Sequence, residues 1–180
     1  MRPARPLVLL LFALTLAAAS LATAGCSSTH GARAWAASVC TTLSPWRTEI
    51  GSLTTRTQQQ MSAATTPGQA KENLVRLFAG AQDASERARA GVVRAGVPDV
   101  NDGAKIAGGF TDSLAAVRDA YGRAMSGIES LNTTPAKTFY EQVGQVVDKL
   151  NADYAASSLD TSKLNSPELK QAFDEVPECR

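Results

Sequence analysis

Residues 102–131 read DGAKIAGGFTDSLAAVRDAYGRAMSGIESL and carry the most regular hydrophobic pattern of the chain. Large apolar side chains recur there at steps of three or four residues, which places them on one face of an α-helix. The pattern predicts a long amphipathic helix from about Asp102 to Leu131, buried along one stripe. The members of that stripe are Ile106, Phe110, Leu114, Val117, Tyr121, Met125, Ile128 and Leu131.

A similar stripe earlier in the chain predicts a first helix from about Arg33 to Ala64. Pro45 lies inside it, where proline removes one backbone hydrogen bond and disfavours helical geometry at Ser44. Two interpretations follow: the helix kinks at Pro45, or a short first piece ends and Ser44-Pro45 caps a second piece. The stripe consists of Trp35, Val39, Leu43, Trp46, Ile50, Leu53, Thr57 and Met61.

Two Thr-Pro pairs mark the starts of the second and fourth helices, because threonine suits the N-cap and proline the first helical position. Thr66-Pro67, with Gln69 in the capping-box position, predicts a second helix that runs to about Ala95. Thr134-Pro135 predicts a fourth helix to about Ser157. The side chains expected to point inward are Leu74, Leu77, Phe78, Ala81, Ala88 and Val92 in the second helix, and Phe139, Val143, Val146, Val147, Leu150 and Tyr154 in the fourth.

These patterns predict an all-α fold. No segment shows a sustained period of two with β-branched residues, so strands are not expected. Four long amphipathic helices with short connections predict an up-down-up-down four-helix bundle over residues 33–180. A short C-terminal helix follows, which begins at Ser166-Pro167 and carries Leu169 and Phe173.

The first 25 residues have the features of a lipoprotein signal peptide. Arg2 and Arg5 form a basic beginning, and the apolar run that starts at Leu7 is too short to compete well as a membrane-spanning helix of about 20 residues. Residues 23–26, Thr-Ala-Gly-Cys, resemble the lipobox of bacterial lipoprotein precursors, although Thr23 stands where that family has Leu, Val or Ile. The resemblance implies lipidation of Cys26, and the two acyl chains of a diacylglycerol would anchor it stably in a membrane.

An ordinary secretory signal is the alternative. Residues 22–24, Ala-Thr-Ala, form a signal-peptidase site, and cleavage there would release a soluble protein that begins at Gly25. It would also leave Cys26 as a stray thiol in an oxidising compartment. In either case residues 26–32 are small and polar and predict a flexible tether, in which His30 is expected to be solvated and to bind nothing.

Charge and residue types give no support to several classes of function. The 18 Lys and Arg nearly balance the 17 Asp and Glu, which offers no electrostatic case for binding nucleic acid. With a single histidine, zinc sites and Cys/His catalysis lack ligands or a base. Residues 99–110 fail the spacing of an EF-hand calcium loop, and they predict a turn before the third helix. No catalytic residue, metal or cofactor is therefore predicted, and we expect a non-enzymatic protein.

The chain resembles a group of small, alanine-rich lipoproteins of actinobacteria whose function is uncharacterised. The shared motifs are Trp35-x-x-x-Val39-Cys40, a second tryptophan at Trp46, and a final Pro177-x-Cys179. The resemblance spans most of the chain after the signal peptide. It implies a common fold and a lipid-anchored location, and it implies no activity.

Counting cysteines predicts one disulfide. If lipid occupies Cys26, the remaining Cys40 and Cys179 form an even pair in an oxidising compartment, where pairing is the default. An even number of antiparallel helices returns the chain to the end where it began, so the two residues can meet. The alternative is two unpaired cysteines, one in the core and one on a frayed tail.

Two functional hypotheses remain. The first is a lipid-anchored helical bundle on the extracytoplasmic face of the cell membrane, which binds a partner protein or cell-wall component or has a structural role. The second is a small-ligand receptor or enzyme with a site between helices, built on Tyr121, Tyr140 or the acidic residues near the C terminus. Convergent carboxylates of raised pKa in a deep pocket would favour the second. Those acidic residues, expected on the solvated face of the last helix, are Glu168, Asp174, Glu175 and Glu178.

Overall fold

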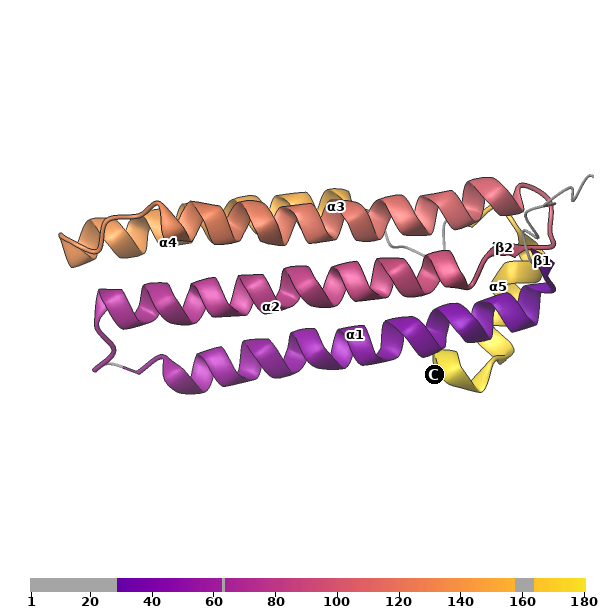
Figure 1. Ribbon diagram of the computed structural model, residues 1–180, viewed down its shortest axis with the longest axis horizontal. Coiled ribbons are helices and arrows are strands. Elements are labelled where there is room, and N and C mark those ends of the chain that lie inside the picture. Colours follow the sequence, from indigo (N-terminus) through magenta and orange to yellow (C-terminus); the bar gives the residue numbers. More distant parts are fainter. Residues whose placement is uncertain (1–28, 63, 158–163) are drawn as a thin grey trace, which may run out of the picture.

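The computed structural model describes residues 29–62, 64–157 and 164–180. Its fold is all-α, as the sequence predicts. Four long helices follow one another, and a short helix and a 3-10 turn close the chain (Figure 1). The predicted signal peptide, residues 1–25, and the predicted lipidation site, Cys26, lie outside the described residues. The helices are α1 (Ala32–Gln60), α2 (Pro67–Arg94), α3 (Gly103–Glu129), α4 (Ala136–Ala156), α5 (Pro167–Glu175) and the 3-10 turn η2 (Pro177–Cys179).

The long helices run in alternating directions. α1, α2 and α3 lie side by side in Figure 1, with α1 packed along α2 and α2 along α3. α4 packs mainly against α3 and makes a smaller contact with α2. α5 and η2 both pack on α1, close to its beginning (Figure 1). The two chain segments that hold the cysteines therefore meet at one end of the bundle.

The starts of α2 and α5 follow the local sequence signals, whereas α4 begins at Ala136 with Pro135 as its N-cap and without the predicted cap from Thr134. The Thr66 hydroxyl accepts a hydrogen bond from the backbone N–H of Gln69, and the side chain of Gln69 accepts one from the N–H of Thr66 at 3.0 Å. This is the predicted capping box, and Pro67 occupies the first helical position. The Ser166 hydroxyl caps α5 by accepting from the N–H of Leu169. Two of the predicted start signals are confirmed in full.

α1 is one helix, with Pro45 inside it. The interpretation with two separate pieces is therefore wrong. A proline costs a helix interior about 3 kcal/mol, but buried Leu43 and Trp46 stand on either side of it and pack in the core. Tertiary packing of an apolar face outweighs local propensity. The helix ends at Gln60, four residues before the predicted end, and Met61 is 36% exposed instead of inward.

Aromatic rings dominate the core where the chain ends meet. Trp35 has no exposed surface. Its indole N–H donates to the backbone oxygen of Gly96 at 2.9 Å. The ring meets Phe110 edge-on with centroids 5.3 Å apart, and it meets Phe173 at 6.1 Å. Phe110 and Phe173 stack on each other at 5.9 Å. One tryptophan thus contacts the loop after α2, as well as α3 and α5.

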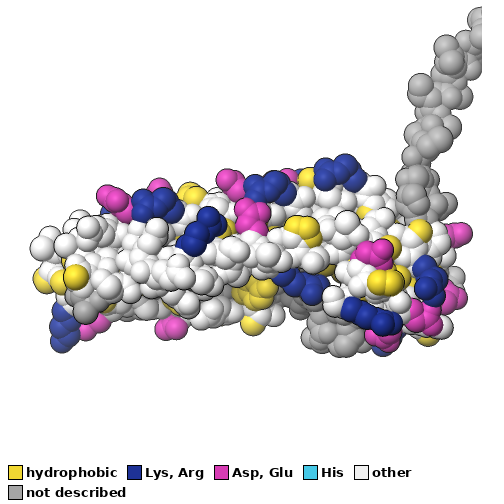
Figure 2. Space-filling model, turned by 90° about the horizontal axis from the view of Figure 1, so that it is seen from below, with side chains coloured by type: hydrophobic (Ala, Val, Ile, Leu, Met, Phe, Trp, Pro, Cys, Tyr) yellow, Lys and Arg dark blue, Asp and Glu magenta, His cyan; other side chains and the backbone are white. Residues whose placement is uncertain are grey.

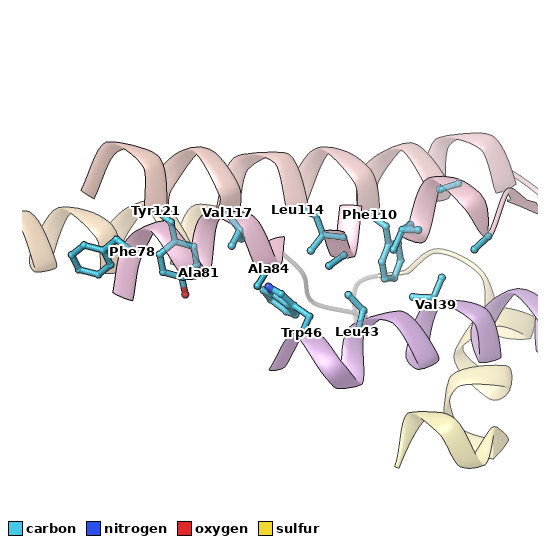
Figure 3. Packing of buried hydrophobic residues seen from close by; sticks show 14 of the residues in the cluster. Val39, Leu43, Trp46, Phe78, Ala81, Ala84, Phe110, Leu114, Val117 and Tyr121 are labelled. Carbon is cyan, nitrogen blue, oxygen red and sulfur yellow. The ribbon is translucent and has the colours of Figure 1, made fainter. Parts of the chain in front are cut away.

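The predicted stripes fill the rest of the core. Leu114, Val117 and Tyr121 point from α3 toward α1 and α2 in Figure 3. Farther along α1, the indole N–H of Trp46 donates to the Ser85 hydroxyl at 3.1 Å, and that hydroxyl donates to a backbone oxygen of α2. The buried polar atoms here are paired, which avoids the cost of about 1–3 kcal/mol for an unsatisfied group.

α4 departs from its predicted burial. Of its described residues only Phe139 is buried. The valines and leucine of the predicted inward stripe are half-buried, and Tyr154 is 43% exposed, so its inward prediction is wrong. The reason is the packing order: α4 has α3 along one side and only a small contact with α2. A helix with one main neighbour buries only the side chains that face that neighbour, so the rest of its apolar stripe stays partly exposed.

A short strand pair ties the start of the domain to the loop before α3. β1 (Thr29–His30) pairs in parallel with β2 (Val97–Pro98). No strand was predicted, and the described part of the predicted flexible tether, residues 29–32, instead forms β1 and the start of α1. Extended segments of two residues are too short for a periodic pattern, but their backbone groups still need partners. The loop is tight, because a Cβ on Gly103 would lie 2.1 Å from the backbone oxygen of Pro98.

Cys40 and Cys179 form the predicted disulfide, with their Cα atoms 5.0 Å apart and 139 positions apart in the sequence. Noncovalent contacts support the same junction. Leu169 of α5 is fully buried in the main core. Ala36 of α1 forms a small second cluster with Ala172 and Val176. We call this end of the bundle, where α5 and η2 cross α1, the clasped end.

We predict that Phe110→Ala lowers the free energy of unfolding by about 3–5 kcal/mol, because Phe110 is 6% exposed and touches two aromatic rings. Urea unfolding measures this change. Tyr154→Ala is the matched control, since Tyr154 is 43% exposed, and its effect should stay within about 0.5 kcal/mol. An effect of Phe110→Ala that small would place the ring at the surface.

We predict that replacing Cys40 and Cys179 together by alanine lowers the free energy of unfolding by up to about 5 kcal/mol. The chain-entropy model gives that upper figure for a loop closed over 139 positions. Cys26→Ala should leave the unfolding free energy unchanged. Peptide mapping without reduction should recover a fragment that joins Cys40 to Cys179, and free thiols at both positions would contradict the pairing.

Candidate functional site

A groove lies between α3 and α4, and small residues of α3 create it. Ala120, Ala124 and Gly127 follow at steps of four and three, so they share one helical face. Opposite them α4 places Val146 and Leu150, and a Cβ on Gly127 would come within 3.2 Å of Val146. A space of about 310 Å³ remains along the seam beside this contact. The floor of this groove is apolar.

An ion cluster closes one end of the groove. Arg123 of α3 donates two hydrogen bonds to one oxygen of Asp153, at 2.9 and 3.2 Å, and Lys149 pairs with the other oxygen. The Asp153 side chain is 16% exposed, whereas those of Arg123 and Lys149 are 57% and 69% exposed. The hydrogen bonds from Lys149 and Arg123 lower the pKa of Asp153 below its ordinary value. The cluster carries one net positive charge at neutral pH.

No charged side chain lines the other end of the groove. Ser130, Leu131 and Gln142 line it. Lys71 reaches this end from α2, but its ammonium group donates to the backbone oxygen of Leu131 at 2.7 Å. That bond satisfies a carbonyl just beyond the end of α3, where the helix has no partner of its own. Charged side chains therefore line the groove only at the ion cluster, although the Lys71 ammonium group lies beyond Leu131 at the other end.

The tyrosines named as site candidates lie apart. Tyr121 is in the core beside Phe78, with ring centroids 6.5 Å apart, and burial raises its pKa to about 12. Tyr140 is 42% exposed, and its hydroxyl donates to the backbone oxygen of Thr65 at 3.5 Å, near the loop that joins α1 to α2. Neither residue lines the groove. The tyrosines are therefore not parts of one site.

The acidic residues near the C terminus lie at the clasped end. Glu168, Asp174 and Glu178 are exposed, as the prediction of a solvated helix face requires. Glu175 is half-buried and forms an ion pair with Arg33 of α1. In Figure 1 this end is opposite the loop beside Tyr140. The carboxylates and tyrosines of the second hypothesis are thus not brought together.

A second ion cluster joins α2 to α3. Glu86 accepts from Arg89 at 2.6 and 2.9 Å and from Arg118 at 2.8 Å. These hydrogen bonds lower the pKa of Glu86 to about 2 and raise the pKa of both arginines. The face in Figure 2 shows the same mixture, with basic and acidic side chains interspersed and hydrophobic ones in separate small groups. Glu86 therefore holds α2 and α3 together through hydrogen bonds to two arginines.

Sequence reasoning missed the groove. The spacing of Ala120, Ala124 and Gly127 is visible in the sequence. These small residues alternate with the large residues of the apolar stripe, so the pattern alone does not separate a groove from the core. Gly127 is one of several glycines inside helices, and Gly144 resembles it although a Cβ there would meet nothing within 4 Å. The two glycines differ only in their neighbours: α4 packs over Gly127, and no described residue packs over Gly144.

No protein-family model, curated protein or solved structure matches the chain. Within residues 29–62, 64–157 and 164–180, no group of three or more His, Cys, Asp or Glu side chains is arranged to hold a metal ion. No helix in the same described part is long and apolar enough to cross a membrane.

The lowered pKa of Asp153 generates a prediction about acid stability. A carboxyl group whose folded pKa is depressed stabilises the fold above its unfolded pKa, here about 3.8, and loses that contribution as pH falls through the folded pKa. Asp153→Asn should therefore lower the urea midpoint at pH 7, and its difference from the wild type should shrink below about pH 4. Asp148→Asn is the control, because Asp148 is exposed on α4 and forms no ion pair with another described residue. A difference that is the same at pH 7 and pH 2.5 would contradict the assignment.

Proposed function

We propose that the protein is a lipid-anchored helical bundle on the extracytoplasmic face of the cell membrane, and that it binds an envelope component without catalysing a reaction. The proposal joins the lipobox-like residues that end in Cys26 to the groove between α3 and α4. The fold by itself specifies no function.

The disulfide between Cys40 and Cys179 is the observation that carries the proposal. Disulfides persist in oxidising compartments and are rare in the cytosol. The bond accounts for both cysteines outside the signal region, which leaves Cys26 for lipid. The signal-like residues lie in the sequence and the disulfide is present in the structure, and both favour a location outside the cytoplasm.

The ionisable groups favour binding over proton transfer. A general acid or base works best with a pKa near the operating pH. The largest shifts move the pKa away from pH 7: the pKa of Glu86 falls to about 2 and that of Tyr121 rises to about 12. Asp153 also shifts downward. Each keeps one protonation state near pH 7, which suits positioning and charge recognition.

The place of the groove also supports a binding role. Only Ser27 and Ser28 separate Cys26 from β1, so a lipid on Cys26 would hold the clasped end next to the membrane. The groove is formed by the second half of α3, toward the opposite end of the bundle (Figure 1). At 1.5 Å per residue, α1 is about 43 Å long. The groove would then lie away from the membrane surface, where components outside the membrane can reach it.

We expect Cys26→Ala to move the protein from the membrane fraction to the medium, or to leave an uncleaved precursor. Fractionation with intact-mass measurement tests this. The wild type should begin at Cys26 and carry the mass of a diacylglycerol with its acyl chains. A wild-type protein that begins at Gly25 without lipid would contradict anchoring and favour the soluble secreted alternative.

A further inference from the structure

We infer that the groove between α3 and α4 binds a single-chain amphiphile with one negative charge, such as a medium-chain carboxylate. This inference rests on the proposed binding function and names its class of ligand. Three features of the described residues carry it: the size of the groove, its length, and the charge at one end.

Size limits the ligand to one chain. Sites for small molecules usually enclose about 300–1,000 Å³, and the space of about 310 Å³ lies at the lower limit. A lipid with two acyl chains would need far more. The walls are also close together, since a Cβ on Gly127 would already contact Val146. One extended chain would lie along the seam between the helices, over the contact of Val146 with Gly127.

Length sets the number of carbons. The lining begins at Ala120 of α3 and ends at Leu131, just beyond that helix. From Arg123, which would hold the head group, to Leu131 is about 12 Å at 1.5 Å per residue. An extended polypeptide advances about 3.3–3.6 Å for every three backbone bonds, so about ten bonds span the same distance. The chain would lie on Ala124, Gly127 and Leu150, which offer it no hydrogen bond through their side chains.

Charge sets the head group and the orientation. Arg123 and Lys149 together exceed the single negative charge of Asp153 by one, so an anion at that end neutralises the cluster. Arg123 uses its Nε and one terminal nitrogen on Asp153, and its other terminal nitrogen has no partner elsewhere in the described chain. A carboxylate or phosphate oxygen is a suitable acceptor. The chain then extends toward Ser130 and Gln142, at the end that no charged side chain lines.

The test is calorimetric titration of the purified full chain with decanoate, kept below its micelle concentration. Decyltrimethylammonium has the same chain with the opposite charge, and hexanoate has the same head on a shorter chain. A lysophosphatidylglycerol with a ten-carbon chain distinguishes a lipid-derived ligand from a free acid by which of the two binds more tightly. Val146→Phe fills the groove. Val147→Phe is its matched control, because Val147 is also half-buried on α4 and does not line the groove.

The inference predicts one saturable site for decanoate. Val146→Phe and Arg123→Gln should each weaken binding at least about tenfold, while Val147→Phe should bind as the wild type does. Hexanoate should bind more than about tenfold more weakly, because each lost methylene removes a further part of the hydrophobic term. Thermal unfolding of each variant must show a folded protein. If Val146→Phe fails to unfold cooperatively, Arg123→Gln, whose side chain is 57% exposed in the wild type, decides alone.

Three results would overturn the inference: no saturable binding of decanoate by the wild type, equal binding by the groove variants, or equal binding of decyltrimethylammonium. None of them bears on anchoring, because the mass of the wild type and the fractionation of Cys26→Ala test that separately. If the protein is lipidated but does not bind decanoate, the proposed location stands and the proposed ligand class is wrong. If the protein carries no lipid but binds decanoate at Arg123, the proposed ligand class stands and the proposed anchoring is wrong.

Discussion

The fold depends most on the burial of the Trp35 indole ring. This one side chain is fully enclosed, donates its N–H to Gly96, and meets Phe110 and Phe173. It therefore connects four segments that are distant in the sequence. Burying an aromatic side chain of this size contributes several kcal/mol only if its N–H finds a partner, and the loop after α2 supplies that partner. The disulfide then fixes the C-terminal segment to α1, and the β1–β2 pair fixes the segment before α1 to the loop before α3. Both lie around the packed core at Trp35.

Stability is consequently distributed unevenly along the bundle. α1 buries most of one face from Trp35 to Trp46, whereas Ile50 and Leu53 beyond it are half-buried. α4 covers α3 with branched side chains over small ones and buries only Phe139. The groove lies in this second, looser region. Binding sites often use parts of low local stability on a rigid support, and the clasped end is such a support.

The sequence predicted what depends on neighbouring residues along the chain. The capping box of Thr66 and Gln69 and the stripe through Leu114 are local patterns, and both are confirmed. The disulfide followed from counting cysteines and from the return of an even number of helices. The continuity of α1 through Pro45 was left open, because local propensity and tertiary packing oppose each other there. Exposed Tyr154, the β1–β2 pair and the groove depend on which helix lies beside which. A hydrophobic stripe shows that a face is apolar, but not how many neighbours cover it.

Hydrogen exchange along α1 tests most directly whether the clasped end holds the bundle together. Amides between Ala36 and Trp46 should exchange only through global unfolding, because this half buries one face and is joined to η2 by the disulfide. Amides between Ile50 and Gln60 should exchange at least about tenfold faster through local opening. Mass spectrometry of overlapping peptides measures both halves in one sample. Equal protection of the two halves, or faster exchange in the first, would contradict this account.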